Sequence, residues 1–211
     1  MKEQIFIFGA SGHAKVVIDI VERQGLYSIA FLVDDDPVLK GMDFFGYPVV
    51  GGKMEALARR NAYPKAIVAI GNNPARGRIC SWLDENNFSR VNAVHPSAQI
   101  SRGVQIGAGT VIMAGACINS DAVLGENVIV NTRASVDHDC VVGDNVHLAP
   151  AVTLCGNVNV GNGSFVCAGS VIIPNITIGM NVIVGAGSTV IKNISDGLKV
   201  AGTPSRAMLK N

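Results

Sequence analysis

Residues 130–148 read VNTRASVDHDCVVGDNVHL, with a branched aliphatic residue at every sixth position. The spacing continues in both directions as one unbroken series: Val94, Ile100, Ile106, Ile112, Ile118, Leu124, Val130, Val136, Val142, Leu148, Leu154, Val160, Val166, Ile172, Ile178, Val184 and Val190. A second series with the same period, from Val104 to Ile194, holds only small or β-branched residues. Hexapeptide periods are typical of a parallel β-helix, in which stacked short strands bury a core that no single strand could bury alone.

Three hexapeptides make one triangular coil of such a solenoid, so residues 18 apart are expected to stack. Glycines follow this spacing at Gly107, Gly125, Gly143, Gly161 and Gly179. Glycine at a corner avoids a clash with a β-carbon or allows a positive φ. A β-sandwich is the alternative, but its strands recur about every 8 to 12 residues. The spacing therefore predicts a β-helix.

The composition excludes some classes of protein. The chain of 211 residues has a net charge of +1, so no basic field for a nucleic-acid partner is expected. No apolar run approaches the roughly 18 residues of a membrane-spanning helix. The first residues enter a strand without a cleavable signal pattern, which favours a cytoplasmic protein. Five cysteines without CxxC spacing argue against a disulfide framework or a zinc site.

The first 91 residues alternate strand and helix patterns, which predicts a small parallel sheet. A buried strand at 4–9 runs through the segment GASGHA into a helical pattern, so free N–H groups and the helix dipole would face an anion. Strands at 29–33 and 66–70 follow, with helices at 53–61 and about 74–87. Ligands bind at the carboxyl ends of such strands, where we expect Ser11, Gly12, His13, Asp34, Asp35 and Gly71. The acids before Pro37 could equally form a solvated turn.

Within the solenoid, His138 is the candidate for proton transfer. The spacing stacks it between Ser120 and Gly156, and Asp137 and Asp139 flank it in the chain. Acids beside an imidazole orient it and raise its basicity, and Gly156 would leave room for a substrate. The plain alternative is a histidine with no role beyond the surface.

His147 lies half a coil away, in a column with Ile129, Phe165 and Ile183. The two histidines therefore point in different directions, which suits a cyclic oligomer whose neighbouring subunits share a groove. Small residues would let an extended ligand lie against the backbone there, or would serve corner packing alone. They form two columns: Thr132, Pro150, Ala168 and Ala186, and beside them Arg133, Ala151, Gly169 and Gly187.

These features together resemble the bacterial sugar acetyltransferases of the NeuD/PglD type, which N-acetylate nucleotide-linked amino sugars or O-acetylate sialic acid. The resemblance covers nearly the whole chain. It rests on Gly9-Ala10-Ser11-Gly12-His13, the acids after the second strand, Ala69-Ile70-Gly71-Asn72-Asn73, the hexapeptides with His138-Asp139, and Val200-Ala201-Gly202-Thr203-Pro204-Ser205-Arg206.

The resemblance implies a Rossmann-like nucleotide-sugar-binding domain at 1–91, a left-handed β-helix acetyltransferase domain at 92–195 and a C-terminal cap at 196–211. It also implies a homotrimer with acetyl-CoA between neighbouring β-helices, and no metal. His138 matches the general base and Asp139 the acid that raises its basicity, where some members carry the longer Glu. The remaining matches are acetyl-CoA contacts at His147, Ala168 and Ala186, and sugar-nucleotide contacts at Ser11, Gly12, His13, Asp34, Asp35 and Gly71.

We therefore expect an acetyl-CoA-dependent N-acetyltransferase that acts by direct transfer on a nucleotide-activated sugar of the 4-amino-4,6-dideoxy type. The alternative within the family is a sialic acid O-acetyltransferase, and the alternative outside it is a non-catalytic trimeric scaffold that binds a sugar nucleotide. A γ-class carbonic anhydrase would need three zinc-binding histidines, and His95, His138 and His147 are poorly spaced for that. A nicotinamide dehydrogenase would need the full glycine motif and a longer first domain.

Overall fold

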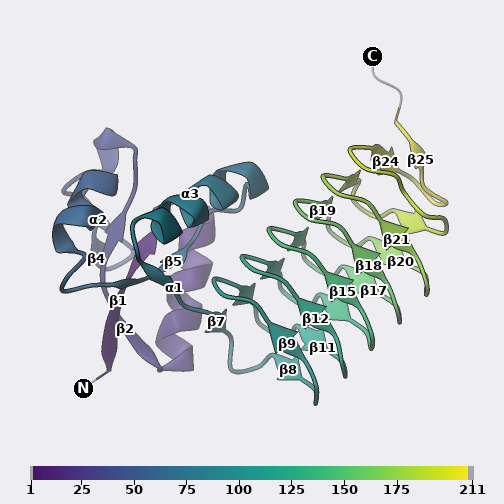
Figure 1. The fold of residues 1–211 in the computed structure, drawn as a ribbon, viewed down its shortest axis with the longest axis horizontal. Helices are drawn as coiled ribbons and strands as arrows, with labels where there is room; N and C mark the ends of the chain where they lie inside the picture. The colour runs from purple at the N-terminus through teal and green to yellow at the C-terminus, as the bar shows by residue number, and fades with distance from the viewer. Residues whose placement is uncertain (1, 209–211) are drawn as a thin grey trace. The chain divides into compact units, whose positions relative to one another are not determined.

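The computed structural model describes residues 2–208 of the chain. The chain folds into two compact units, which divide between Pro96 and Ser97. In Figure 1 the first unit runs from purple to dark teal, and the second runs on to yellow. Among the helices that the structure describes, none is long and apolar enough to cross a membrane.

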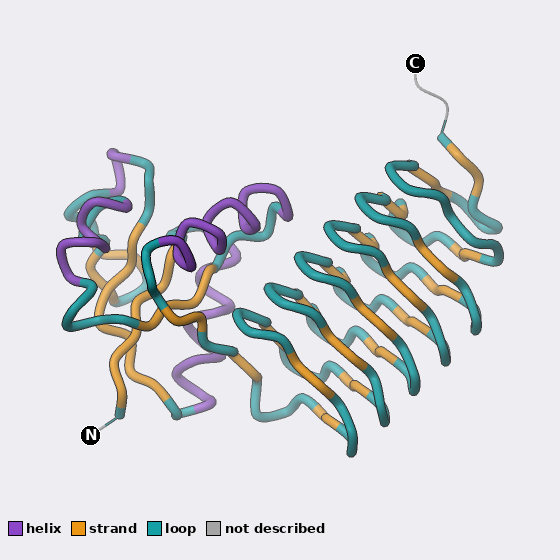
Figure 2. The backbone as a smooth tube through the Cα atoms, in the orientation of Figure 1, coloured by secondary structure: helices purple, strands orange, loops and turns teal. Residues whose placement is uncertain are grey.

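The first unit is built on a parallel sheet with the strand order β2, β1, β5, β6 (Figure 2). Its strands are β1 (Glu3–Phe8), β2 (Tyr27–Val33), β3 (Asp43–Phe44), β4 (Tyr47–Pro48), β5 (Lys65–Val68), β6 (Ser89–Arg90) and β7 (Ala93–Val94). Its helices are α1 (Gly12–Gln24), the 3-10 helix η1 (Pro37–Leu39), α2 (Lys53–Arg59) and α3 (Asn73–Glu85). The predicted strands and helices of this unit are confirmed, and the antiparallel hairpin β3–β4 was not predicted.

The core of the first unit is aromatic. The ring of Phe6 stacks on Phe31 with centroids 5.5 Å apart and meets the ring of Phe88 edge-on at 5.3 Å. Trp82 of α3 packs against Phe8 and Phe88. Aromatic pairs in such geometries contribute about 0.5–1.5 kcal/mol each beyond the area that they bury. They hold α3 against the sheet.

Helix α1 places its first turn at the carboxyl end of β1. It begins after Ser11 and ends at Gly25, whose φ of 72° lies in the left-handed region. The N–H of Gly25 closes the last turn on the carbonyl of Val21, as glycine commonly does at a helix end. The residues of α1 that are buried recur at helical spacing and fix which side faces the sheet: Ala14, Val17, Ile18, Ile20 and Val21.

The second unit is a parallel β-helix with three sheets. One contains β8, β11, β14, β17, β20 and β23, the next contains β9, β12, β15, β18 and β21, and the third runs from β10 through β13, β16, β19 and β22 to β24 and β25. The strand bounds are β8 (Gln99–Ile100), β9 (Gln105–Ile106), β10 (Val111–Ile112), β11 (Cys117–Ile118), β12 (Val123–Leu124), β13 (Ile129–Val130), β14 (Ser135–Val136), β15 (Val141–Val142), β16 (His147–Leu148), β17 (Thr153–Leu154), β18 (Asn159–Val160), β19 (Phe165–Val166), β20 (Val171–Ile172), β21 (Thr177–Ile178), β22 (Ile183–Val184), β23 (Thr189–Val190), β24 (Lys199–Ala201) and β25 (Arg206–Ala207). The predicted fold class, an α/β unit followed by a left-handed parallel β-helix, is confirmed.

The aliphatic series forms the core of the solenoid. Every member from Ile112 to Val190 is buried. Ile100 is an exception with 41% of its surface exposed, because β8 is the first strand of its sheet. Hydroxyl groups in the second series are buried as well, and they are satisfied by backbone carbonyls: Ser164 Oγ donates to Gly179 O at 2.8 Å and Ser170 Oγ to Gly185 O at 2.9 Å.

The corner glycines avoid a clash rather than supply a positive φ. A β-carbon on Gly107 would stand 2.4 Å from the backbone of Gly125, and one on Gly161 would stand 2.6 Å from the backbone of Gly179. The left-handed conformation falls two residues later, at Gly109, Asn127, Asn145, Gly163 and Asn181. Asparagine tolerates that region better than most residues, so the turns do not require glycine at every coil.

The last coil is shorter than the others. Ile194 bridges to Ile178, 16 residues before it, and not to Ile176 as the strict period predicts. Strand β24 continues the third sheet, and β25 turns back antiparallel along it. Residues 209–211 of the expected cap lie outside the described part of the chain.

Candidate active site

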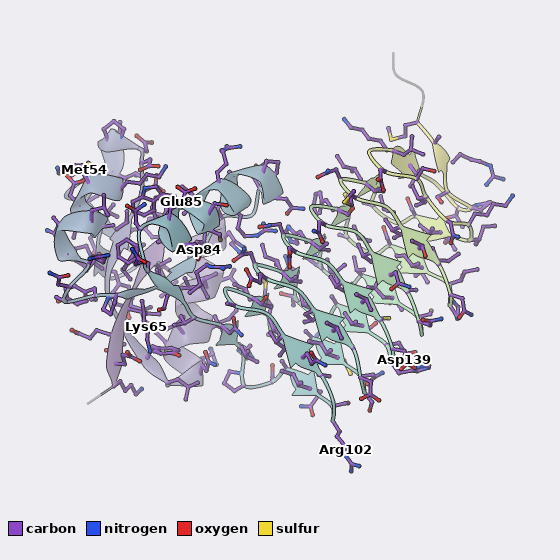
Figure 3. The ribbon with its side chains drawn as sticks, in the orientation of Figure 1. Met54, Lys65, Asp84, Glu85, Arg102 and Asp139 are labelled. Carbon is purple, nitrogen blue, oxygen red and sulfur yellow. The ribbon has the colours of Figure 1, made fainter. Side chains whose placement is uncertain are left out.

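His138 lies in the turn between β14 and β15, at a corner of the β-helix. Figure 3 labels its neighbour Asp139 on the rim of the coils. The turn is hydrogen-bonded to the same turn of both adjacent coils: Asp139 N–H donates to Ser120 O at 3.2 Å, and Asn157 N–H donates to His138 O at 2.9 Å. The predicted stacking of Ser120, His138 and Gly156 is confirmed.

Asp139 orients the imidazole. Its Oδ2 lies 2.8 Å from Nδ1 of His138, so aspartate is long enough for this contact. The hydrogen bond raises the pKa of His138 above its ordinary value, and the negative charge of Asp137 raises it further. The side chains of His138 and Asp139 are 59% and 61% exposed. When Nδ1–H is donated to Asp139, the neutral ring keeps the lone pair of Nε2 for a proton from a bound group.

The ring of His138 lies over Gly156 in the next coil. A β-carbon on Gly156 would stand 2.7 Å from both Cε1 and Nε2 of the imidazole. The expectation that Gly156 leaves room for a substrate is therefore wrong in this detail, because the ring itself fills the space. The backbone N–H of Gly156 donates to no acceptor within residues 2–208. A hydrogen-bond donor is thus available beside the imidazole.

His147 has a different environment, on strand β16. It is 9% exposed, and its ring packs on Phe165 with centroids 4.9 Å apart and planes tilted by 30°. Its Nε2 lies 3.1 Å from Nδ2 of Asn131. The predicted column with Ile129, Phe165 and Ile183 is confirmed by the strand pairing. Asn131 was missed by the sequence reasoning, because it belongs to neither hexapeptide series and to no motif.

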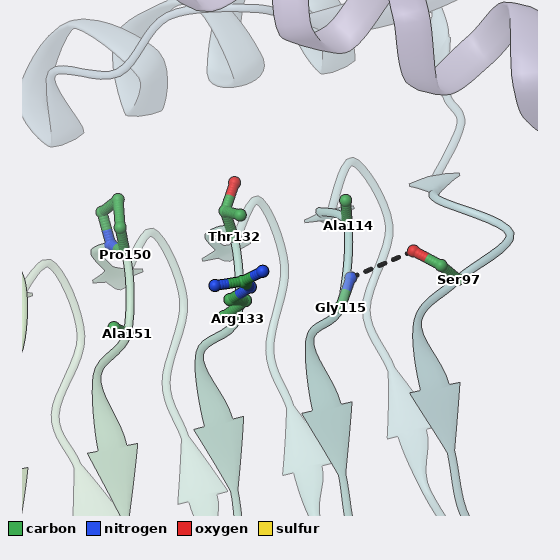
Figure 4. Close-up of a pocket in the computed structure, with 7 residues that line it drawn as sticks. All are labelled: Ser97, Ala114, Gly115, Thr132, Arg133, Pro150 and Ala151. Carbon is green, nitrogen blue, oxygen red and sulfur yellow. Dashed lines mark hydrogen bonds between the residues drawn. The ribbon is translucent and has the colours of Figure 1, made fainter.

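The small residues form stacked turns at another corner. Ala151 N–H donates to Thr132 O at 3.0 Å, and Gly187 N–H donates to Ala168 O at 2.9 Å. Ala168 and Ala186 are exposed, as a ligand contact requires. Figure 4 shows a groove at the early coils of this corner, where Gly115 N–H donates to Ser97 Oγ at 3.1 Å. The groove is lined by Ser97, Ala114, Gly115, Thr132, Arg133, Pro150 and Ala151. Ala168 and Ala186 are not part of this lining.

In the first unit, the predicted glycine turn lies between β1 and α1. Gly9 has a φ of 117°, and a β-carbon there would stand 2.8 Å from Ala69 O, so only glycine fits. Ser11 precedes α1 without a side-chain cap bond. Apart from the adjacent residues and the backbone of α1 itself, no atom lies within 4 Å of the position that a β-carbon would take on Gly12 or on Gly71. Both glycines therefore border open space.

The three aspartates after β2 differ in their contacts. Asp34 Oδ2 accepts a hydrogen bond from Ala10 N–H at 2.8 Å and so ties the end of β2 to the glycine turn. Asp35 Oδ1 accepts from Lys53 N–H at 3.2 Å, at the start of α2. Asp36 Oδ1 caps η1 through Val38 N–H at 3.0 Å. Of the three, Asp34 is the one joined to the glycine turn.

His13 and Gly71 are brought together through Arg76. Burial lowers the pKa of His13 to about 4, with the positive charge of Arg76 as a second cause, so the ring is neutral at pH 7. Its Nε2 is buried and has no hydrogen-bond partner within the described chain. Arg76, only 1% exposed, donates from Nη1 to Ile70 O and Gly71 O, each at 3.2 Å. Arg76 was not predicted, because a single arginine in a helix gives no sign of burial.

Within residues 2–208, no group of three or more His, Cys, Asp or Glu side chains could hold a metal ion. The chain is similar along nearly its whole length to solved acetyltransferases. PerB from Caulobacter crescentus, in complex with CoA and GDP-perosamine, is 40% identical with a TM-score of 0.93, and the match covers 97% of each chain. The acetyltransferase domain of PglB from Neisseria gonorrhoeae FA1090, in complex with acetyl coenzyme A, is 34% identical with a TM-score of 0.89 over 99% of this chain and 100% of that one.

The chain belongs to the NeuD/PglD-type family of sugar acetyltransferases. In this NeuD/PglD-type protein, residues 4–83 match the PglD N-terminal domain. UDP-N-acetylbacillosamine N-acetyltransferase of Bacillus subtilis (strain 168) is 38% identical over 116 residues, which are 53% of this chain and 52% of that relative. The match thus spans about half the length of the curated relative. The family prediction is confirmed.

Proposed function

We propose that this protein is an acetyl-CoA-dependent N-acetyltransferase whose acceptor is a nucleotide-activated amino sugar, of the 4-amino-4,6-dideoxy type. The observation that carries the proposal is the His138–Asp139 pair, in which Nδ1 is held at 2.8 Å and Nε2 remains available. The relative solved with CoA and GDP-perosamine, and the one solved with acetyl coenzyme A, support the choice of the two substrates.

In the proposed reaction, Nε2 of His138 takes a proton from the sugar amine as the amine nitrogen attacks the thioester carbonyl. The new C–N bond forms, the C–S bond breaks, and the CoA thiolate leaves and takes the proton back from Nε2 of His138, which regenerates the neutral base. A positioned base of this kind contributes about 10² to 10⁴ in rate. The N–H of Gly156, which has no acceptor within residues 2–208, is suited to the oxyanion that develops during attack. Transfer is direct.

The acetyl donor is proposed to lie along the small-residue corner. His147, Ala168 and Ala186 are the proposed contacts, because the alanines are exposed and leave the backbone accessible. The two histidines lie on different faces of one β-helix, so we further propose a homotrimer in which neighbouring subunits complete each site. A cytoplasmic location stays a prediction.

The sugar nucleotide is proposed to bind to the first unit at the carboxyl ends of β1, β2 and β5. Gly12 and Gly71 border open space there, and the buried Nε2 of His13, which has no hydrogen-bond partner within the described chain, lies close behind that surface. The proposed contacts are Ser11, Gly12, His13, Asp34, Asp35 and Gly71. The helix N-terminus of α1 adds a partial positive charge that favours a diphosphate.

The test measures the release of CoA thiol from acetyl-CoA with a panel of UDP- and GDP-linked 4-amino-4,6-dideoxy sugars and free sialic acid. We expect turnover of one nucleotide amino sugar, with the acetyl group found on nitrogen by mass spectrometry. His138→Ala should lower the rate by about 10² or more. Turnover of sialic acid alone would replace the proposed acceptor, and binding of both ligands without any turnover would replace catalysis with a scaffold role.

A further inference from the structure

Asp137, on the other side of His138 from Asp139, makes two side-chain hydrogen bonds that fix the start of the catalytic turn. Its Oδ1 accepts from the backbone N–H of His138 at 2.9 Å and from Nδ2 of Asn119 at 2.8 Å. Asn119 occupies the same position one coil earlier, and its Oδ1 accepts from the Cys117 thiol at 3.6 Å. Both the amide nitrogen and the amide oxygen of Asn119 are thereby hydrogen-bonded, which restricts rotation of the Asp137 carboxylate.

The turn itself does not need this carboxylate. The next two coils carry Cys155 and Ile173 at the position of Asp137, and neither side chain can replace a carboxylate as an acceptor. The residues two positions later, Asn157 and Asn175, nevertheless adopt φ values of 57° and 62°, close to the 58° of Asp139. The same corner therefore forms with or without an acid. An acid at this position occurs where the turn carries a histidine.

Asp137 also acts on the charge of its neighbour. The hydrogen bonds from Asn119 and from the His138 N–H lower the pKa of Asp137, so it is ionised throughout the titration of the histidine. The charged groups that act on His138 are Asp139 and Asp137, in that order. Ser120 and Gly156, stacked on either side, carry no charge. Asp121, one coil before Asp139, is directed at Gly103: its carboxyl carbon lies 3.0 Å from the position of a β-carbon there.

We propose that Asp137 is a positioning residue for His138: it fixes the backbone from which the imidazole projects and keeps a permanent negative charge beside the ring. This inference rests on the proposed role of His138 as general base. The hydrogen bonds of Asp137 go to the backbone of His138 and to Asn119, while the imidazole nitrogen Nδ1 pairs with Asp139, so Asp137 acts through His138. Asn119 supports it from the preceding coil.

Two substitutions separate charge from geometry. Asp137→Asn keeps an oxygen that accepts the same two hydrogen bonds and removes the charge, whereas Asp137→Ala removes both. Asp144→Asn is the matched control, because Asp144 Oδ1 likewise accepts a backbone N–H of a turn, that of Glu126 at 2.8 Å, at a corner without a histidine. Thermal unfolding midpoints of all variants check that the coil remains folded.

The first measurement is the NMR titration of the His138 ring without substrates, with its signals assigned by their loss in His138→Ala. We expect Asp137→Asn to lower the pKa of His138 and Asp144→Asn to leave it unchanged. An unchanged titration in Asp137→Asn would overturn the charge role. This measurement needs no turnover, so it decides the charge role even if the panel of sugars shows the proposed function to be wrong.

The second measurement is the pH profile of kcat/KM with the accepted sugar. The base acts when neutral, and a lower pKa makes it neutral at lower pH, so the acid limb of Asp137→Asn should move to lower pH. Asp137→Ala should also lower kcat on the plateau by about tenfold, within the roughly 10²-fold cost of a 1 Å misplacement. KM for both substrates should remain close to that of the parent protein. A loss confined to KM, or an equal loss in Asp144→Asn, would show a merely structural role.

Discussion

The corner that carries His138 and the strand that carries His147 place the same residue type in opposite environments. His138 is exposed, hydrogen-bonded to one carboxylate and close to a second. His147 is 9% exposed, and the partners described above for it, Phe165 and Asn131, are neutral. An exposed ring beside acids is suited to gain and lose a proton. The ring of His147 is instead held in place by burial and by its packing on Phe165.

The difference teaches that environment, and not residue type, separates the proposed base from the proposed contact to acetyl-CoA. The two turn residues beside His138 are acids, Asp137 half-buried and Asp139 exposed, whereas strand pairing fixes the neighbours of His147. Substitutions of the two histidines and of the residues around them test whether His138 acts in proton transfer and His147 in binding acetyl-CoA.

The largest expected effect comes from removing each histidine in turn. His138→Ala should lower kcat by about 10² to 10⁴, because the amine then loses its proton without a positioned base. His147→Ala should lower kcat much less. Steady-state kinetics with both substrates saturating measures the contrast, and equal losses of kcat in the two variants would abolish it.

Gly156→Ala should have the next largest effect. The added methyl group would stand 2.7 Å from two atoms of the His138 ring, so the imidazole must move. A displacement of about 1 Å lowers the rate by up to roughly 10²-fold. In a background of His138→Ala the same change should cost nothing further, and a clear additional loss in that double variant would contradict the steric explanation.

Asp139→Asn should have a smaller effect on rate and a distinct effect on pH dependence. The hydrogen bond that Asp139 accepts from His138 raises the pKa of His138, so its removal lets the neutral base form at lower pH. The acid limb of kcat/KM should therefore move to lower pH, while the plateau falls by about tenfold because the ring is less well oriented. A limb that stays in place would mean that another group sets the profile.

Asn131→Ala should have the smallest effect. It removes the 3.1 Å contact to Nε2 of His147, together with the bond that Asn131 Oδ1 accepts from Thr132 N–H at 2.8 Å, and it leaves the corner of His138 unchanged. We expect KM for acetyl-CoA to rise a few-fold, as loss of one hydrogen bond of about 1 kcal/mol implies, with kcat nearly unchanged. A drop in kcat without a change in KM would assign Asn131 to the chemical step.

The solenoid could be predicted from the sequence to the level of single columns. Since strands stack at a fixed spacing, arithmetic alone places His138 next to Gly156 and His147 next to Phe165, and the structure confirms both pairs. It could not place the His138 ring over Gly156, because the period fixes the direction of a side chain and not its rotamer. It also could not foresee the shorter last coil, which moves Ile194 onto Ile178.

The first unit was predictable in its strands and helices but not in its loops. The sequence places Asp34, Asp35 and Asp36 equally well at the sheet edge. Their separate partners, the N–H groups of Ala10, Lys53 and Val38, depend on how the segment after β2 packs. Burial of Arg76 likewise follows from tertiary packing, since the helix pattern of α3 contains no mark of it.

Because residues of the β-helix stack at a spacing of 18, only insertions or deletions of whole coils keep the later residues at their own corners. Deleting one whole coil beyond Gly156 would shorten the solenoid and leave His138 above the same glycine, with every remaining turn at its own corner. Deleting a single hexapeptide there would turn all later residues by one face and carry Ala168 and Ala186 away from their corner. The length of the solenoid is therefore free to change in steps of one coil, while smaller changes would move the two alanines proposed to contact acetyl-CoA away from the corner that they share with Thr132 and Pro150.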